Sequence, residues 1–401
     1  MKRGVIALVV AIQLATTAAF AESGKKYDPG ASDAEIKLGQ TMPYSGPASV
    51  LSGVGKGQVA YFKYLNETQG GVNGRKINLL SLDDGYSPPK TVELTRQLVE
   101  RDKVFAIVNT IGTATNRTTH RYLNQKKVPQ FFILSGAAQW NDPKNYPWTM
   151  MGMVAYQTEG AVYARNILTT TPNARIALLR QNDDFGTDYV EGFKHALGDK
   201  AGMIVAEVSF ETTDPTVDAQ IIQLRASNAD AFFVVATGKH ATQAIRKAHE
   251  LGWKPQIYLP VGSASIPGVL KPAGADAATG IITAANSKSA GDPTWENDPG
   301  MKEYFDWAQK WAPELNPHDS FVAAGYSNGY ILAHLLRQAG NALTREYFMR
   351  QATSLKGFTT PLTLPGIVIE TGPDDYLPYQ SLRLQRFDGT SYKLIGDVIR
   401  E

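Results

Sequence analysis

The segment IKLGQTMPYSGPASVLSGVGKGQVAYFKYLNETQGGVNGRKINLLSLDD, residues 36–84, combines two strand patterns and one helix pattern. Ile36–Thr41 is rich in residues that favour strands, and a Gly/Ser/Pro loop follows it. The apolar side chains near Val54–Gln69 recur with helical spacing, and Lys76–Leu82 again has the pattern of a strand. A strand, a helix and a second strand in this order predict a βαβ unit with parallel strands.

The same alternation continues along the chain. Up to residue 134 we predict the helices Pro88–Arg101 and Asn116–Lys126 and the strands Val104–Val108 and Gln130–Leu134. After the Pro/aromatic stretch Asn141–Met153 the alternation restarts, with helices predicted at Tyr156–Thr170, Val190–Leu197, Val217–Ser227 and Ala241–Leu251, and strands at Arg175–Leu179, Ile204–Phe210, Ala231–Ala236, Gln256–Leu259 and Gly280–Thr283. Three helices, Gly300–Trp311, Ser320–Ala339 and Thr344–Thr353, precede two closing strands, Ser381–Arg386 and Tyr392–Ile399.

This order predicts an α/β fold of two doubly wound, Rossmann-like lobes. In open α/β sheets, ligands bind beyond the carboxyl ends of the strands. Two such lobes that face each other form a cleft, and the loops after the strands are expected to line it.

The N-terminus has the three parts of a secretory signal peptide. Lys2 and Arg3 give a positive start, Val5–Leu14 is an apolar run, and Ala19-Phe20-Ala21 has the small-x-small pattern of a cleavage site. An apolar run of about ten residues is too short to span a bilayer. We therefore predict that residues 1–21 are a signal peptide and that the mature protein is exported.

Composition narrows the possible partners. The formal net charge is +2, and removal of the signal peptide takes away two positive charges and no acids. The mature chain therefore has no basic excess for nucleic acid or for anionic lipid, and we expect no membrane insertion. Cysteine is absent, which excludes thiolate metal sites, cysteine nucleophiles and an acylated N-terminal cysteine. We predict a soluble periplasmic protein without a lipid anchor.

Two glycine-rich motifs suggest other chemistry. Gly325–Gly329 fits G-x-S-x-G, the nucleophile elbow of hydrolases, with Ser327 as the nucleophile. That elbow needs a strand before it, whereas Ser320–Ala339 has the pattern of one helix, so an exported serine hydrolase is the weak alternative. Gly53–Gly57 resembles a phosphate loop but matches neither nucleotide-binding pattern. The histidine spacing fits no zinc motif, and we predict no cofactor and no metal.

At several points the sequence resembles the periplasmic solute-binding proteins of ABC importers, in particular the class that binds leucine, isoleucine and valine. Seven segments carry this resemblance, and they follow one another along the chain in the same order as in the family. They are Ile36–Gly39, Pro43–Pro47, Gly70–Ile77, Asp83-Asp84 with Pro88, Val128-Pro129 with Leu134-Ser135, Asn182–Gly186 and Ala248–Gly252. The resemblance implies a non-enzymatic protein with two lobes joined by three crossovers. Residues 34–150 and 285–362 would form lobe one, and residues 151–284 and 363–401 would form lobe two.

The resemblance also implies the ligand-binding residues. Lobe one would contribute the Tyr44-Ser45 pair, the Ile111-Gly112-Thr113 loop, Ala137 and Gln139, with Gly112 and Thr113 suited to hold a carboxylate through backbone N–H groups. Lobe two would contribute Tyr156, Phe185, Lys239, Gly262 and Ser263, and Phe321 matches an aromatic wall position.

This chain departs from the amino acid binders in one respect. They carry an acidic residue in the loop after the strand predicted at Gln256–Leu259, where it neutralises the ammonium of the ligand. Here that loop reads Pro260-Val261-Gly262-Ser263, and Lys239 stands where the family has a tyrosine. A buried ammonium without a partner is costly. We therefore predict a small carboxylate, aromatic or apolar, with a branched-chain or other amino acid as the alternative.

The partners follow from the class. We expect a monomer that closes on its ligand and docks on the permease subunits of an ABC transporter in the inner membrane. A role in handing the ligand to a separate sensor stays open, since fold does not separate the two roles.

Overall fold

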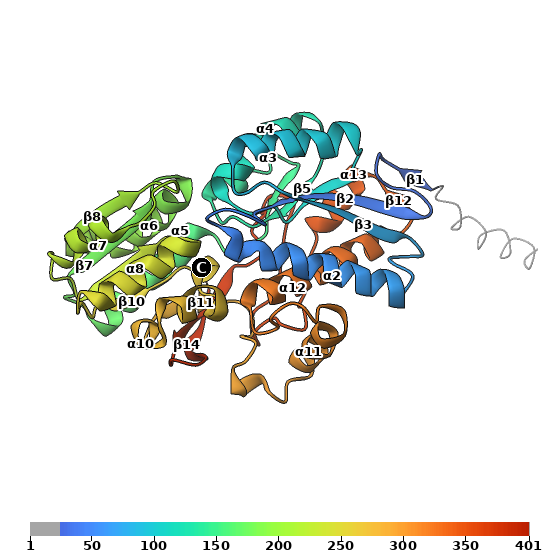
Figure 1. Ribbon diagram of the computed structural model, residues 1–401. Helices are drawn as coiled ribbons and strands as arrows, with labels where there is room; N and C mark the ends of the chain where they lie inside the picture. The colour runs from blue at the N-terminus through green and yellow to red at the C-terminus, as the bar shows by residue number, and fades with distance from the viewer. Residues whose placement is uncertain (1–24, 401) are drawn as a thin grey trace, which may run out of the picture.

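The computed structural model describes residues 25–400, so the predicted signal peptide lies outside the described residues. One sheet has five strands in the order β3-β2-β4-β5-β6, and all its neighbouring strands are parallel (Figure 1). Its strands are β2 (Glu35–Met42), β3 (Lys76–Asp83), β4 (Ala106–Val108), β5 (Gln130–Ile133) and β6 (Thr149–Met151). We refer to this sheet and its helices as lobe one.

The second sheet, in lobe two, has seven strands in the order β14-β13-β11-β10-β9-β7-β8. The strands from β11 to β8 are parallel, and the hairpin β13–β14 adds to β11 in the antiparallel direction. Its strands are β7 (Ile176–Gln181), β8 (Ile204–Phe210), β9 (Ala231–Val235), β10 (Gln256–Tyr258), β11 (Ile282–Ala285), β13 (Ser381–Phe387) and β14 (Tyr392–Arg400). A separate pair joins β1 (Lys26–Tyr27) to β12 (Ala342–Leu343).

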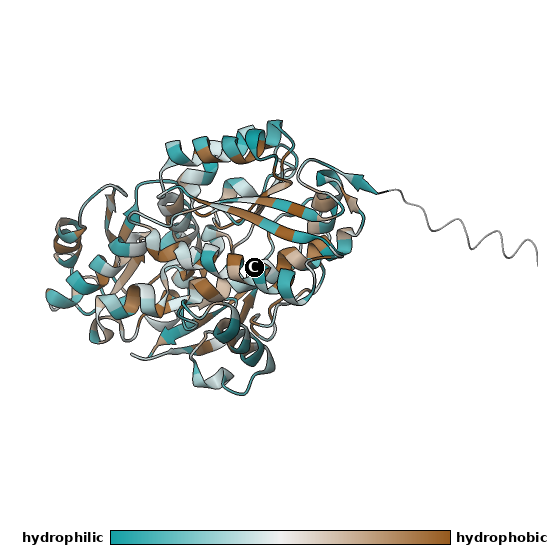
Figure 2. Cartoon of the chain, turned by 45° about the vertical axis from the view of Figure 1, so that its right-hand side comes forward, coloured by the Kyte–Doolittle hydropathy of each residue, from teal (hydrophilic) through white to brown (hydrophobic). Residues whose placement is uncertain are grey.

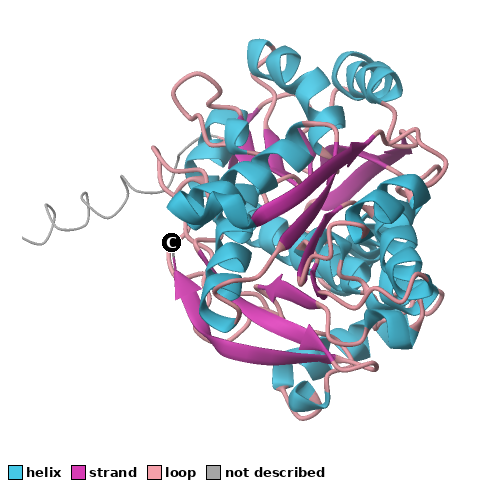
Figure 3. Cartoon of the chain, turned by 90° about the vertical axis from the view of Figure 1, so that its left-hand side faces the viewer, coloured by secondary structure: helices cyan, strands magenta, loops and turns pink. Residues whose placement is uncertain are grey.

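Helices lie on both sides of the two sheets, and Figure 3 shows the strands between them. Lobe one carries α2 (Gly53–Thr68), α3 (Pro88–Arg96), α4 (Thr113–Gln125), α11 (Pro299–Trp311), α12 (Ser320–Ala339) and α13 (Arg345–Ala352). Lobe two carries α5 (Tyr156–Thr170), α6 (Asp184–Leu197), α7 (Asp218–Arg225), α8 (Gly238–Glu250), α9 (Lys271–Ala273) and α10 (Ala275–Ala278). Shorter helical turns are η1 (Ser49–Ser52), η2 (Gln97–Arg101), η3 (Ala138–Trp140), η4 (Gly198–Met203), η5 (Val261–Ser263), η6 (Ile266–Leu270) and η7 (Pro293–Trp295). The predicted two-lobed α/β fold is confirmed.

The central strands bury both faces, as parallel sheets covered by helices do. In β9, Phe232 and Val234 pack on the side of α7 and α8, whereas Phe233 and Val235 pack on the side of α5 and α6. Figure 2 shows hydrophobic residues along the strands and hydrophilic residues on much of the outer helices. Each sheet therefore separates two apolar layers.

The chain passes between the sheets three times: between β6 and α5, between β11 and α11, and between α13 and β13. Two isolated bridges tie these crossing segments together, Val154 with Tyr379 and Ser287 with Thr363. The exact boundaries predicted for the two lobes stay a prediction.

Some element predictions were wrong in detail. The single helix predicted at Pro88–Arg101 is an α-helix only as far as Arg96, and Gln97–Arg101 forms a π-helical turn. The strand predicted at Gly280–Thr283 begins two residues later, at Ile282, because Gly280 has a φ of +92° that no strand residue adopts. The stretch Asn141–Met153 contains the short strand β6, which three residues without alternation could not indicate.

The two glycine-rich motifs form one helix-to-helix contact between α2 and α12. A Cβ atom on Gly325 would lie 2.2 Å from the carbonyl oxygen of Val54, and one on Gly57 would lie 2.6 Å from that of Val322. The helix predicted at Ser320–Ala339 is confirmed with the same bounds, so Ser327 lies inside a helix rather than at a strand-to-helix turn. Both motifs therefore serve close backbone packing.

We expect Gly325→Ala to lower the free energy of unfolding by about 1–3 kcal/mol, because the added methyl group meets backbone that cannot move aside. Gly202→Ala is the matched control, since nothing lies within 4 Å of its added Cβ. Urea unfolding of both variants measures the difference. An equal effect of the two substitutions would contradict the role assigned to the α2–α12 contact.

Candidate functional site

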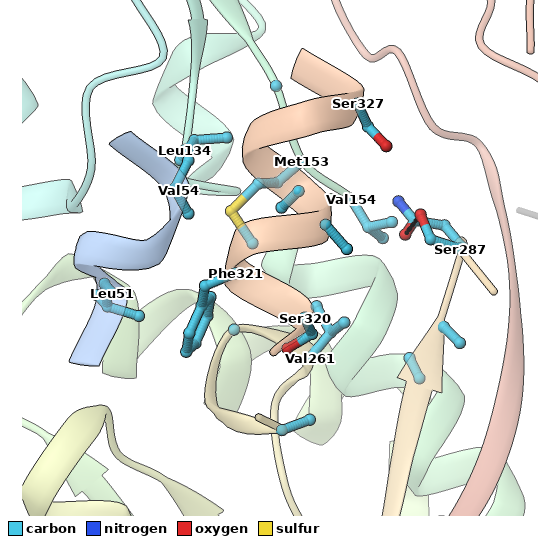
Figure 4. Close-up of a pocket in the computed structure, with 18 of the residues that line it drawn as sticks. Leu51, Val54, Leu134, Met153, Val154, Val261, Ser287, Ser320, Phe321 and Ser327 are labelled. Carbon is cyan, nitrogen blue, oxygen red and sulfur yellow. Dashed lines mark hydrogen bonds between the residues drawn. The ribbon is translucent and has the colours of Figure 1, made fainter. Parts of the chain in front are cut away.

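A cavity of about 230 Å³ lies between the lobes, at the carboxyl ends of the strands (Figure 4). Much of the wall comes from loops and helices that follow strands, and α12 adds Phe321, Ala324, Ser327 and Asn328. The apolar walls are formed by Leu51, Val54, Ile111, Leu134, Met153, Val154, Val261, Ala264, Ile266, Phe321 and Ala324. Both lobes thus contribute to one predominantly apolar chamber, as the doubly wound topology predicts.

Aromatic side chains form the wall next to α5 and α6. The ring of Tyr156 stacks on Tyr189 with centroids 4.5 Å apart, and it meets the edge of Phe185 at 5.1 Å. These three residues line the cavity together with Tyr86, whose ring covers Gly112. The residue at position 112 must be glycine, because its φ is +101° and a Cβ would lie 2.5 Å from the Tyr86 ring.

Direct contacts hold the lobes together around the cavity. The Ser265 hydroxyl donates to the Asp319 carboxylate at 2.9 Å, and the same carboxylate oxygen accepts from the backbone N–H of Phe321. On another side, Arg117 of lobe one pairs with Asp184 of lobe two at 2.6 Å. The structure is therefore that of closed lobes.

Six of the predicted site residues line the cavity. They come from the strand-end loops and helix starts that the βαβ pattern indicated, and they are Ile111, Gly112, Tyr156, Phe185, Gly262 and Phe321.

The other predicted residues from lobe one are not among those that line the cavity. The Tyr44 hydroxyl bonds Ser81 at 2.6 Å, and the Ser45 hydroxyl donates to Asp83. The Thr113 and Ser135 hydroxyls bond each other at 2.7 Å. Ala137 is buried, and the Gln139 amide donates to Asp184 across the lobe boundary.

The structure also places two predicted residues of lobe two away from the cavity. Lys239 is exposed, and its Nζ points to the Pro215 carbonyl at 3.5 Å. Thr237, two residues earlier, is the N-cap residue of α8 and lines the cavity. The buried Ser263 hydroxyl donates to the Ala236 carbonyl at 2.6 Å. The structure therefore does not bring a cation from α8 to the ligand chamber.

The sequence profile described as "Periplasmic binding protein" matches residues 35–390. The chain belongs to the periplasmic binding protein family. A curated relative from Pseudomonas aeruginosa, the leucine-, isoleucine-, valine-, threonine- and alanine-binding protein, is 22% identical over 331 residues, which are 81% of this chain and 84% of the relative. The predicted family resemblance is confirmed, and members of this family are binding proteins rather than enzymes.

Two solved structures share the fold of this periplasmic binding protein. One is a branched chain amino acid ABC transporter protein from Thermus thermophilus with bound valine, with a TM-score of 0.81, 18% identity and coverage of 93% of this chain and 97% of that one. The other is an ABC transporter solute binding protein from R. palustris in complex with benzoate, with a TM-score of 0.75, 18% identity and coverage of 92% and 98%. Among the described residues no helix has the length and apolarity that a membrane crossing requires.

Among the described residues that line the cavity of this binding protein, none is Asp or Glu. Glu159 of lobe two is fully buried and does not line the cavity. Glu159 accepts hydrogen bonds from the Val261 backbone N–H at 2.7 Å and from the hydroxyls of Tyr189 and Tyr163. It therefore fixes the η5 loop, whose residues Val261 and Gly262 form the cavity wall.

Sequence reasoning missed several residues of the site. Glu159 lies in the first turn of α5, where its polar pattern suggested only a helix start. Ser327 and Asn328 also line the cavity, and their spacing of seven residues from Ser320 and Phe321 was the signal that could have identified them, because residues seven apart share a helix face.

Burial raises the pKa of Glu159 above its ordinary value, so the folded protein holds this proton more tightly than the unfolded chain does. The resulting stabilisation is complete below the unfolded pKa of about 4.3 and is lost as the pH rises through the folded pKa. We expect the wild type to lose stability relative to Glu159→Gln as the pH rises above the unfolded pKa of about 4.3. Urea unfolding of both proteins over a series of pH values is the measurement, and a difference that does not change with pH would contradict the expectation.

Proposed function

We propose that this periplasmic binding protein captures a small carboxylate with an aromatic or other apolar body and delivers it to an ABC transporter permease. The observation that carries the proposal is the combination of apolar and aromatic walls with a described lining that has no carboxylate. Binding proteins of this type deliver small molecules to such permeases. The proposal adds the chemical class of the ligand and a monomeric state.

The missing carboxylate argues against an α-amino acid. An ammonium group that enters a closed cavity loses its hydration, and without an anionic partner this desolvation costs several kcal/mol. The η5 loop offers Val261 and Gly262 to the cavity, and Glu159 behind it already accepts three hydrogen bonds. A ligand without an ammonium avoids this cost.

The size of the cavity and its rings favour a ring-bearing ligand. An apolar cavity of about 150 Å³ holds benzene, so one of about 230 Å³ accommodates one ring with a short polar extension. Contacts of such a ring with Tyr156, Phe185 and Phe321 would each add about 0.5–1.5 kcal/mol beyond the area that they bury. The benzoate complex of the R. palustris protein demonstrates that this fold accepts an aromatic carboxylate.

Closure of the two lobes on the ligand would tell the permease that the binding protein is loaded. The Ser265–Asp319 and Arg117–Asp184 contacts link residues of different lobes, so they form only in the closed state. A ligand that touches both lobes favours this closed state by its differential affinity, and the permease can then distinguish loaded from empty protein.

A charge substitution tests the proposed ligand class. A Cβ on Gly262 would have only the Met153 Cε atom within 4 Å, at 3.8 Å, so Gly262→Asp adds a carboxylate to the wall with little steric strain. We expect at least tenfold weaker binding of cinnamate and at least tenfold tighter binding of leucine, about 1.4 kcal/mol in each case. Titration calorimetry measures both affinities.

The isosteric variant Gly262→Asn is the control, because it adds the same volume without the charge. We expect it to change the preference between the two ligands far less than Gly262→Asp does. Wild-type protein that already prefers leucine to cinnamate would contradict the proposed ligand class.

A further inference from the structure

Tyr86 follows β3 in a tight turn, and its backbone conformation is unusual for an aromatic residue. Its φ is +61° and that of the preceding Gly85 is +58°, so both residues occupy the left-handed region. Glycine adopts this region freely, whereas a bulky side chain does so at a cost. Residues that are kept in such conformations concentrate at functional sites. The turn therefore holds Tyr86 in a position that its own backbone preference disfavours.

The buried carboxylate of Asp84 fixes this turn. One of its oxygens accepts the backbone N–H of Tyr86 at 2.9 Å, and the other accepts the Thr91 hydroxyl at 2.8 Å. The Asp84 carbonyl also accepts the backbone N–H of Ser87 at 2.9 Å, directly before α3. Asp84 is 1% exposed, so water does not compete for these bonds. Together they offset the strain at Tyr86 and fix the direction in which its side chain leaves the backbone.

The ring of Tyr86 lies over the carboxyl edge of the lobe-one sheet. A Cβ on Gly112 would lie 2.5 Å from this ring, so the absence of a side chain after β4 makes room for it. After the neighbouring strand β5, a Cβ on Gly136 would lie 2.7 Å from the ring of Tyr156, which comes from lobe two. Both rings line the cavity. Two glycines at one sheet edge thus admit one tyrosine from each lobe.

The hydroxyl of Tyr86 lies close enough to lobe two to be affected by its charges. Burial raises the pKa of Tyr86, and the Asp183 carboxylate and Tyr156 of lobe two raise it further. Asp183 is the N-cap residue of α6 and accepts the backbone N–H of Gly186 at 3.2 Å. Tyr86 is therefore a lobe-one residue at the boundary of the two lobes, where it can contact a ligand that joins them.

We propose that Tyr86 determines ligand specificity by presenting a fixed flat face to the ring of the ligand. This assignment rests on the function proposed above and deepens it, because it makes the chamber select planar rings over saturated rings of the same size. Aromatic rings pack well against one another in offset or edge-to-face arrangements, whereas a saturated ring is thicker and lacks the π-face. A mobile side chain would adapt to either shape, but Asp84 and Gly112 leave Tyr86 little freedom to move.

Titration calorimetry with 3-phenylpropanoate and 3-cyclohexylpropanoate tests the assignment, because these acids differ only in whether the ring is aromatic. We expect the wild type to bind 3-phenylpropanoate at least about fivefold more tightly. Tyr86→Leu keeps an apolar side chain and the same backbone strain but removes the flat face, so we expect its preference to fall below about twofold or to reverse. Tyr86→Phe keeps the face and is expected to retain the wild-type preference.

Tyr44→Leu is the matched control, since Tyr44 packs in the same apolar cluster of lobe one but does not line the cavity. We expect it to leave the preference unchanged. The unfolding temperature of each variant without ligand establishes that it is folded. If Tyr86→Leu does not fold, Tyr86→Gly provides the test, because glycine adopts a φ of +61° without strain and also removes the flat face.

The outcomes separate this assignment from the proposed function. A wild type that binds the two acids equally, or a folded Tyr86→Leu or Tyr86→Gly variant that keeps the wild-type preference, would overturn the role of Tyr86 while the proposed function stands. If wild-type protein binds none of cinnamate, 3-phenylpropanoate and 3-cyclohexylpropanoate, the proposed function fails, and the assignment that rests on it fails with it.

Discussion

The close contact between α2 and α12 is the constraint on which the ligand chamber depends. Gly57 and Gly325 let the two backbones approach to a distance at which any side chain would clash with a carbonyl oxygen. This approach brings Val54 of α2 beside Phe321 of α12, and both form the cavity wall. The same helix extends to Ser327 and Asn328, so one helix-to-helix contact fixes both the apolar and the polar parts of the chamber.

The fold was largely predictable because its signals are local. Alternating strand and helix patterns demand parallel sheets covered by helices, and this logic does not depend on exact boundaries. What the pattern could not supply were features decided by tertiary packing. The three-residue strand β6 exists because it pairs with β5, and the π-helical turn at Gln97–Arg101 has no sequence signature that distinguishes it from an α-helix.

The sequence indicated which loops and helix starts reach the candidate site, but it did not indicate which side chains point into it. Gly112, Tyr156 and Phe321 stand where strand ends and helix starts meet the cleft. Lys239 stands there too, but its side chain turns outward, because the direction of a side chain at a helix start depends on its neighbours rather than on its position in the sequence. Glu159 and Asn328 escaped notice because each looks like an ordinary helical residue until its buried surroundings are known.

The central claim is that the chamber accepts an apolar carboxylate and rejects the ammonium of an amino acid. Leucine and 4-methylpentanoate differ only in the α-ammonium group, so titration calorimetry of this pair against the wild-type protein isolates its effect. The account predicts that 4-methylpentanoate binds at least tenfold more tightly than leucine, which is about 1.4 kcal/mol. Tighter binding of leucine would contradict it.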